Sequence, residues 1–244
     1  MYGLIGKKLG HSFSAQFFNE KFKREGIKEE YLLLPIPEIS DFPELLVKYP
    51  DLHGLNVTIP YKQEVMPFLS EISEDAEEIG AVNTIKITGD NGKIKLKGYN
   101  TDVIGFRESL KPLLRPEIKK ALVLGSGGAS KAVVYVLKKA GITPTLVSRN
   151  PHPDNLSYHD LDKRIMEENL LIVNTTPLGM FPDVDSYPPI PYHLLTDRHI
   201  CFDLVYNPLE TEFMKKSAKM GAQTKNGIEM LHGQAIASWD IWNS

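Results

Sequence analysis

A set of small polar side chains in the first part of the chain lies where strand-like runs end and helix-like runs begin. The set consists of Ser12, Ser14, Thr58, Asn83, Thr101 and Asp102. In α/β proteins, ligands bind in the crevice beyond the carboxyl ends of the strands. Several hydroxyl, amide and carboxylate groups meeting there suit a hydroxyl-rich ligand, because such a ligand needs many directional hydrogen bonds. Taken singly, Ser14 and Asp102 can also be explained as helix caps and Asn83 as a turn former.

A lysine occupies an unusual place in the same region. The run "GLNVTI" (54–59) has the pattern of a strand, Pro60 breaks it, and Lys62 follows two residues later. Proline cannot continue a strand ladder, so the chain turns at Pro60 and Lys62 begins the next segment at the carboxyl edge of the sheet. The alternative interpretation is a surface lysine that contacts only solvent.

A glycine-rich turn is the main signal in the second half. The run "ALVLGSGGASKAVVYVLKKAG" (121–141) passes from a strand into a helix, with Gly125, Gly127 and Gly128 at the turn. Glycines let a pyrophosphate approach the backbone, and the N–H groups and dipole of a helix N-terminus attract it. Glycine-rich turns also end strands for steric reasons alone, so it is the strand-to-helix context that indicates a dinucleotide site.

The end of the next strand indicates which dinucleotide is bound. An acid about 20 residues beyond the glycine turn would bind a free ribose 2′-hydroxyl. The chain instead has "VSRN" at this place, with Arg149 and no acid before Asp154. Arginine suits a 2′-phosphate, so the sequence favours NADP(H) over NAD(H). A solvated surface arginine is the competing explanation.

The order of strand and helix signals predicts an α/β protein. In the first half we expect a helix between Ser14 and Gly26, a helix near 42–49, a tight turn at Asn91–Gly92 that joins two antiparallel strands, and further strands at 2–6, 30–37 and 54–59. In the second half we expect helices at 102–114, 128–140 and 210–221 and strands at 120–125, 143–149, 170–176 and 199–206. This second block is typical of a doubly wound, Rossmann-type parallel sheet. An apolar stripe at 228–242 predicts a final helix.

The composition excludes several classes of protein. The 244 residues carry a net charge of -3, so the chain lacks the basic field that a nucleic-acid partner would require. It also lacks a run of about 18 apolar residues, so no membrane partner is expected. Cys201 is the single cysteine, and its place in the apolar run "HICFDLVY" favours a buried structural thiol. We therefore expect a cytoplasmic protein. We further expect a monomer or a homodimer that acts on a small molecule and holds no metal.

Stretches from near residue 3 to near residue 237 share the order and spacing of one family. They are "GHSFSAQFFN", "GLNVTIPYKQEV", "IGAVNTI", "GYNTDVIGF", "VLGSGGASKAV", "VNTTPLGM", "FDLVYNPLET" and "GIEMLHGQA". On these motifs the whole chain resembles the shikimate dehydrogenase family. The resemblance implies an enzyme that reversibly reduces 3-dehydroshikimate to shikimate with NADPH, on the route to chorismate and the aromatic amino acids. It also implies an N-terminal α/β substrate-binding and catalytic domain (1–101), joined by a C-terminal helix (227–244), and an NADP-binding Rossmann-type domain (102–226).

The resemblance further implies a role for each matching residue. The catalytic pair would be Lys62 and Asp102, which in the family hydrogen-bond across the cleft. The substrate would be bound by Ser12, Ser14, Thr58, Lys62, Asn83, Asp102, Tyr206 and Gln234, with Asn56 nearby in support. The cofactor would be bound by Gly125, Ser126, Gly127, Gly128, Ala129, Ser130, Ser148, Arg149, Leu204 and Gly227.

The departures from the family pattern concern mainly the cofactor. The chain has "SRN" where "NRT" is expected, and Pro153 replaces a second basic residue. The nearest alternative is therefore a quinate/shikimate dehydrogenase that uses NAD(H), which Ser12 and the Ser148–Arg149 pair argue against. A regulator or binding protein that kept the fold without turnover is a second alternative, because fold does not imply function. Lys62 and Asp102 argue against it.

Overall fold

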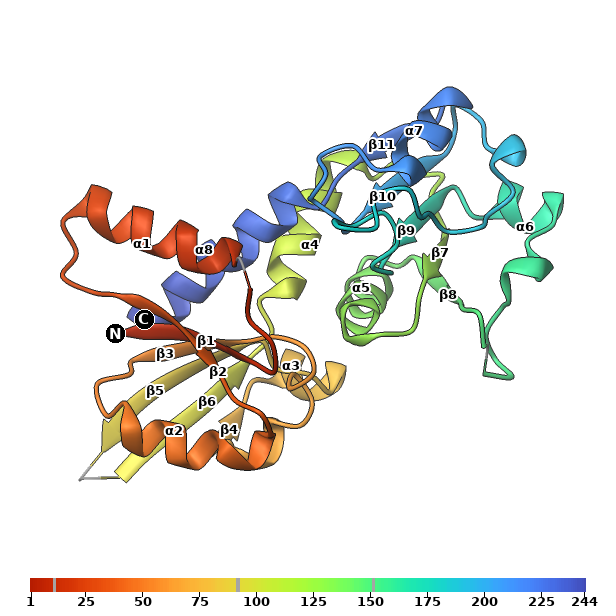
Figure 1. Ribbon diagram of the computed structural model, residues 1–244. Coiled ribbons are helices and arrows are strands. Elements are labelled where there is room, and N and C mark those ends of the chain that lie inside the picture. The colour runs from red at the N-terminus through yellow and green to blue at the C-terminus, as the bar shows by residue number, and fades with distance from the viewer. Residues whose placement is uncertain (11, 91–92, 151) are drawn as a thin grey trace. The chain divides into compact units, whose positions relative to one another are not determined.

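The chain forms two compact units. The structure is a computed structural model that describes residues 1–10, 12–90, 93–150 and 152–244 (Figure 1). The first unit contains Met1–Thr101 and Gln234–Ser244, and the second contains Asp102–Gly233. The chain therefore passes between the units twice, after Thr101 and before Gln234.

A six-stranded mixed sheet with the order β2-β1-β3-β5-β6-β4 is the framework of the first unit. Its strands are β1 (Tyr2–Gly6), β2 (Tyr31–Pro35), β3 (Gly54–Val57), β4 (Glu71–Ile72), β5 (Thr84–Asp90) and β6 (Lys93–Tyr99). The first three strands are parallel, and β2 and β3 flank β1 on opposite sides. The winding therefore reverses at β1, so the segments that follow β1 and β3 emerge at the same edge of the sheet.

The expected antiparallel pair is confirmed. β5 pairs antiparallel with β6 and also with β3. The turn expected at Asn91–Gly92 lies outside the described residues. β3 ends at Val57, two residues before the end of the strand expected from the sequence, and Pro60 stands in the turn that follows.

Helices cover both faces of the first sheet (Figure 1). In that view α1 (Phe13–Glu25) and α8 (Ile228–Asn243) lie on one face and α2 (Phe42–Lys48) on the other, and α3 (Glu74–Ile79) precedes β5 in the chain. The N-cap of α1 is Ser12, whose hydroxyl oxygen accepts a hydrogen bond from the N–H of Ala15 at 3.4 Å. The interpretation of Ser14 as the cap is therefore wrong, and Ser14 lies in the first turn. The expected stop is confirmed, because Gly26 ends α1 with a φ of 66°, a conformation that favours glycine.

An aromatic cluster holds α1 and α8 against the first sheet. Tyr2 stacks on Trp242 and Phe18 stacks on Tyr31, each with ring centroids 4.8 Å apart. All four side chains are buried. Stacked aromatic pairs add about 0.5–1.5 kcal/mol beyond the burial of their area. The apolar stripe expected at 228–242 is therefore a helix that packs back on the first unit.

A five-stranded parallel sheet with the order β11-β10-β9-β7-β8 forms the second unit. Its strands are β7 (Lys120–Leu124), β8 (Thr143–Val147), β9 (Leu171–Asn174), β10 (Ile200–Asp203) and β11 (Gln223–Lys225). Its helices are α4 (Asp102–Leu110), α5 (Gly128–Lys139), α6 (Lys163–Glu168) and α7 (Glu212–Lys219). The expected doubly wound parallel sheet is confirmed, and its winding reverses between β7 and β9. A ligand-binding crevice is expected beyond the carboxyl ends of these two strands.

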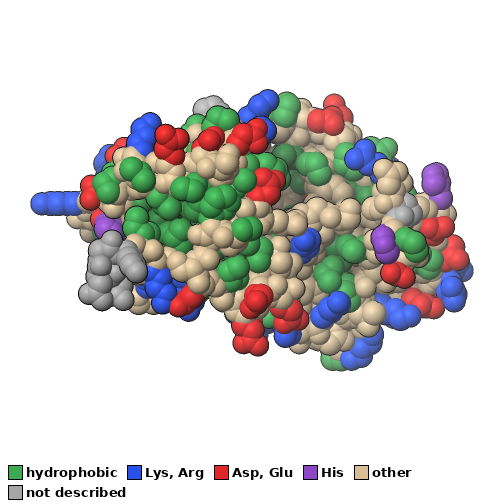
Figure 2. Space-filling view, turned by 90° about the horizontal axis from the view of Figure 1, so that it is seen from below, with side chains coloured by type: hydrophobic (Ala, Val, Ile, Leu, Met, Phe, Trp, Pro, Cys, Tyr) green, Lys and Arg blue, Asp and Glu red, His purple; other side chains and the backbone are tan. Residues whose placement is uncertain are grey.

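Several short elements complete the fold. Single 3₁₀ turns occur at Ile39–Asp41, Met66–Phe68, Lys111–Leu113, Tyr158–Asp160 and Tyr192–Leu194. The helix expected at 102–114 therefore ends at Leu110 and continues as a 3₁₀ turn. Within the described ranges, no helix is both long enough and apolar enough to cross a membrane. Acidic and basic side chains are interspersed on the face shown in Figure 2.

Candidate active site and cofactor site

The serines that follow β1 are held by the start of α1 and by the edge strand β2. The hydroxyl oxygen of Ser12 caps the helix, and the hydroxyl of Ser14 is a hydrogen-bond partner of the Tyr31 phenol. Burial raises the pKa of Tyr31 well above its usual value, so the phenol stays protonated and donates to Asn56 Oδ1 at 2.7 Å. The loop after β1 is thereby connected to the middle of β3.

Thr58 begins the loop that follows β3. Its N–H still donates to the carbonyl of Ile5 at 2.9 Å, which extends the pairing of β3 with β1 by one bond. A side chain at Gly6 would collide with the methyl group of Thr58, so the ends of the two strands approach closely. Thr58 is half-buried at the edge of the sheet where the loop after β1 also emerges.

A buried polar cluster lies behind this edge. We define it as Asn56, Asn83, Thr84, Thr101 and Ser238, all of which are buried. Asn56 Nδ2 donates to Thr84 Oγ1 at 3.1 Å and to Ser238 Oγ at 3.0 Å. Asn83 Oδ1 accepts from the N–H of Thr101 at 2.7 Å and from its hydroxyl at 3.1 Å. These bonds leave the Nδ2 group of Asn83 available to donate elsewhere.

Val82 and Asn83 hold the backbone near both residues of the expected catalytic pair. The N–H of Val82 donates to the carbonyl of Lys62 at 2.7 Å. The side chain of Asn83, the next residue, accepts from Thr101, which is joined by a peptide bond to Asp102. The segment before β5 therefore fastens the turn that carries Lys62 and the residue that leads into Asp102. Buried Tyr61, whose hydroxyl donates to the carbonyl of Ile36 at 2.8 Å, secures the Lys62 turn from the other side.

The glycine turn after β7 has the features that a dinucleotide phosphate requires. Gly125 has a φ of 105°, a conformation that side chains rarely adopt, and its Cα faces Thr175 of the neighbouring strand end. Space is open above the Cα atoms of Gly127 and Gly128. Gly127 is the N-cap of α5 and has no side chain to occupy the first N–H groups of the helix. Ser126 is exposed, Ala129 is half-buried, and the hydroxyl of Ser130 donates back to the carbonyl of Gly127 at 2.6 Å.

The end of β8 supplies a polar group and a cation. Ser148 Oγ is buried and finds no hydrogen-bond partner among the residues that the structure describes. The next residue, Arg149, is exposed and forms no ion pair within the same described ranges. His152 Nδ1 lies 3.6 Å from Asp154 Oδ2, so this histidine already faces a carboxylate. The residues present fit the 2′-phosphate of NADP(H), and Arg149 is the cation that would meet it.

Leu204 and Gly227 meet at the end of β10. A Cβ atom on Gly227 would collide with the carbonyl of Leu204, so this close approach requires glycine. The N–H of Gly227 donates to the carbonyl of Val205 at 3.1 Å, and the N–H of Leu204 donates to the carbonyl of Asn174 at 3.0 Å. Tyr206 follows in the same loop and is half-buried, and burial raises its phenol pKa.

Asp203, which the sequence did not indicate as a site residue, holds this loop in place through its carboxylate. Its carboxylate has no exposed surface and accepts from Asn174 Nδ2 at 2.9 Å, from the N–H of Val205 at 3.0 Å and from Thr211 Oγ1 at 2.6 Å. Desolvation outweighs these three donors and raises the pKa of Asp203 to about 6. The same Asn174 side chain accepts from the N–H of Thr176 at 3.0 Å, so the ends of β9 and β10 are tied together.

The raised pKa of Asp203 predicts a pH dependence of stability. Its usual value is 3.8, so between about pH 4 and pH 6 the folded protein keeps a proton that the unfolded chain releases. The free energy of unfolding should therefore fall as the pH rises, by at most about 3 kcal/mol from this group. Asp203→Asn cannot titrate, so urea unfolding at several pH values should show its stability rising relative to the unmodified protein across this range. A difference that is independent of pH would contradict the raised pKa.

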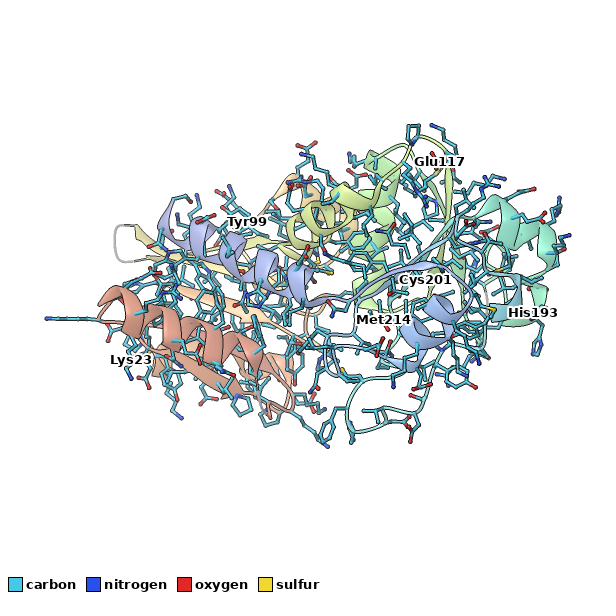
Figure 3. All side chains as sticks on the ribbon, turned by 90° about the horizontal axis from the view of Figure 1, so that it is seen from above. Lys23, Tyr99, Glu117, His193, Cys201 and Met214 are labelled. Atoms are coloured by element: carbon cyan, nitrogen blue, oxygen red, sulfur yellow. The ribbon has the colours of Figure 1, made fainter. Side chains whose placement is uncertain are left out.

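Cys201 is structural, as the sequence indicated. It lies in β10 inside the second unit (Figure 3) with no exposed surface. Burial raises the pKa of its thiol to about 12, which leaves too little thiolate for a nucleophile. Among the described residues, no three His, Cys, Asp or Glu side chains are grouped so that they could hold a metal ion.

Comparisons with known proteins place the chain in a family. The family model described as the shikimate dehydrogenase substrate binding domain matches residues 4–85. A shikimate dehydrogenase (NADP(+)) from Methanococcus maripaludis is 40% identical over 258 residues, covering 99% of this chain and 91% of the relative. The chain belongs to the shikimate dehydrogenase family.

Solved structures share the fold over the full chain. The chorismate mutase/shikimate 5-dehydrogenase fusion protein from Clostridium acetobutylicum is 40% identical, with a TM-score of 0.87, and the match covers 99% of this chain and 90% of that one. The quinate dehydrogenase from Corynebacterium glutamicum, solved with NAD, is 27% identical, with a TM-score of 0.87, and the match covers 99% of this chain and 92% of that one. Both halves of the shikimate dehydrogenase fold are therefore present.

The structure distributes the expected shikimate dehydrogenase site residues over both units. Within the first unit, the sheet edge and the helix that packs back on it carry Ser12, Ser14, Thr58, Lys62, Asn83 and Gln234. The second unit carries Asp102, Tyr206 and every expected cofactor residue. Sequence reasoning missed Thr84 and Ser238 of the polar cluster. A signal for Ser238 exists, since it is a serine one helical turn after Gln234 in an otherwise apolar stripe.

Proposed function

We propose that this chain is a shikimate dehydrogenase that reversibly reduces 3-dehydroshikimate to shikimate with NADPH, a step toward chorismate and the aromatic amino acids. The main support for this proposal is that relatives named for this activity match nearly the whole chain, including the polar sheet edge of the first unit and the glycine turn of the second. The two units supply different requirements of the reaction. One offers hydrogen-bonding groups for a hydroxyl-rich ring, and the other offers a phosphate-binding turn together with Arg149, which forms no ion pair among the described residues.

Lys62 is the residue that acts on the reacting carbonyl in this proposal. Bound NADPH supplies the hydride, which leaves negative charge on the carbonyl oxygen of the substrate. The ammonium of Lys62 stabilises that charge and gives its proton to the oxygen. In the oxidation direction, the amine accepts the proton of the shikimate hydroxyl. The family pattern assigns Asp102 the role of orienting Lys62. Val82 holds the backbone of Lys62, and Asn83 holds Thr101, the residue before Asp102.

Recognition of the ring relies on directional polar groups. Asn83 is suited to this because its Oδ1 is committed to Thr101 and Thr84 while its Nδ2 is left to donate to a substrate hydroxyl. Thr58, Ser12 and Ser14 add hydroxyl groups at the same sheet edge. Gln234 and Tyr206 complete the set. A site built from fixed polar groups rejects analogues that lack a matching hydroxyl, because a buried group is then left unpaired.

A quinate/shikimate dehydrogenase that uses NAD(H) is the second candidate. The fold match to the quinate dehydrogenase from Corynebacterium glutamicum favours it, at the same TM-score as the fusion protein but at lower identity. The two candidates differ at the end of β8. Arg149 without a preceding acid suits a 2′-phosphate, which NAD(H) lacks.

A matrix of two substrates and two cofactors tests the proposal. The purified chain should form NADPH from shikimate and NADP⁺ with the highest kcat/KM of the four combinations. Quinate lacks the ring double bond and carries an extra hydroxyl, so it should react more slowly with either cofactor. Faster turnover of quinate with NAD⁺ would establish the second candidate. No turnover in any combination would leave a binding protein on the same fold.

A further inference from the structure

Two hydroxyl groups at the centre of the buried polar cluster have no role in the proposed chemistry. Thr84 Oγ1, from β5, and Ser238 Oγ, from α8, lie 2.9 Å apart, and neither residue has exposed surface. Thr101 Oγ1 lies 3.1 Å from the first and 3.2 Å from the second. Three segments that are distant in sequence therefore meet in one triangle of hydroxyl groups.

The cluster touches both places where the chain passes between the units. Thr101 is the last residue of the first unit before the chain leaves it, and Gln234 is the first residue after the chain returns. The hydroxyl of Ser238 donates to the carbonyl of Gln234 at 2.9 Å. Both passages are thus fixed on the side of the first unit by the same hydroxyl groups, next to Asp102 in one case and at Gln234 itself in the other.

The three hydroxyl groups and the side chain of Asn56 all form hydrogen bonds within the cluster. Each hydroxyl has one proton to donate, and the two protons of Asn56 Nδ2 are shared among Thr84, Ser238 and the carbonyl of Asn83. Removal of either hydroxyl would leave a gap in this buried cluster and take a hydrogen-bond partner from Asn56 Nδ2. Such a gap is relieved by a shift of the segments that the hydroxyl had joined, in this case those leading to Asp102 and Gln234.

We propose that Thr84 and Ser238 are positioning residues, whose hydroxyl groups set the placement of Asp102 and Gln234 for catalysis. This inference rests on the proposed function, in which those two residues face the substrate. A displacement of about 1 Å can cost about 100-fold in rate. Loss of one hydroxyl should therefore change shikimate kinetics, whereas binding of the cofactor, which uses the second unit, should stay the same.

Four variants separate positioning from packing. Thr84→Val keeps the shape of the side chain without its hydroxyl, Thr84→Ser keeps the hydroxyl without the methyl group, and Ser238→Ala removes the partner. The matched control is Ser217→Ala in α7, because Ser217 is equally buried and donates to the carbonyl of Phe213, four residues earlier, at 2.7 Å. Each variant is assayed for kcat, for both KM values and for urea unfolding.

We expect Thr84→Val and Ser238→Ala each to lower kcat/KM for shikimate about 10-fold, with the KM for NADP⁺ unchanged. Thr84→Ser should restore most of the activity, and Ser217→Ala should lose stability only. Equal damage from Thr84→Ser and Thr84→Val would overturn the proposal, as would kinetic losses that simply follow stability through all four variants. If Ser238→Ala does not fold, the Thr84 pair decides. If the unmodified protein is active and the Thr84→Val and Ser238→Ala variants are unaffected, this inference alone is refuted. If the unmodified protein is inactive, the proposed function is refuted and this inference with it.

Discussion

Replacement of Lys62 by alanine should remove most of the turnover, by about 10²- to 10⁴-fold, while the affinity for shikimate changes far less. The ammonium acts on charge that develops only as the carbonyl is reduced, so its loss affects the transition state more than the bound substrate. The backbone of this turn is held by Val82 and by buried Tyr61, so truncation of the side chain should leave the turn in place. Steady-state kcat and a separate shikimate titration by calorimetry measure the two effects.

Two further variants make the Lys62 result specific. Lys62→Met keeps much of the length of the side chain without charge or proton, and it should match Lys62→Ala in kcat. Lys97→Ala removes a partly buried lysine on β6 that pairs with Glu71 at 3.3 Å, and it should retain normal turnover. Near-normal kcat in Lys62→Met would show that the ammonium is dispensable and would rule out its role as proton donor.

The sequence predicted the parts of the fold that depend on local pattern. Three such predictions are confirmed: the glycine turn after β7, the stop of α1 at Gly26 and the helix at the apolar stripe of α8. Each follows from backbone conformation or from periodicity within one segment. The start of α1 was wrong because two serines stand two residues apart, and either can cap a helix. The choice of Ser12 frees Ser14 to bind the Tyr31 phenol, a contact that no local pattern contains.

Elements and contacts that depend on distant partners could not be predicted in this way. β4 and β11 have only two and three residues, and they exist because β6 and β10 pair with them. Ser238 and Thr84 are 154 positions apart in the chain and become neighbours only once α8 packs on the first sheet. Resemblance to a family indicates residues that are expected to touch ligands and, behind them, Asn56, but it does not indicate Thr84 or Ser238, which complete the polar cluster.

Removal of the Arg149 side chain should weaken the binding of NADP(H) strongly and leave the binding of NAD(H) almost unaffected. A hydrogen bond to a charged group contributes about 1.5–3 kcal/mol, so Arg149→Ala should raise the KM for NADP(H) by about 10- to 150-fold. Arg149 is exposed and forms no ion pair within the described residues, so no carboxylate among them competes for the guanidinium. NAD(H) has no 2′-phosphate, so its KM reports whether the rest of the site is intact.

We expect the rise in the KM for NADP(H) to lie near the lower end of that range, because the site lacks a second strong cation. Pro153 stands where some family members have a basic residue, and His152 already faces Asp154 at 3.6 Å. His152→Ala should therefore change the KM for NADP(H) by less than about twofold. An exposed histidine that already lies beside a carboxylate contributes little to the binding of a second anion. Asp154→Asn releases His152 from that carboxylate and should lower the KM for NADP(H), because the imidazole then has no competing anion beside it. Equal losses for both cofactors in Arg149→Ala would show that Arg149 supports the fold and not the phosphate, and an unmodified protein that prefers NAD(H) would overturn the assignment of the 2′-phosphate site to the end of β8.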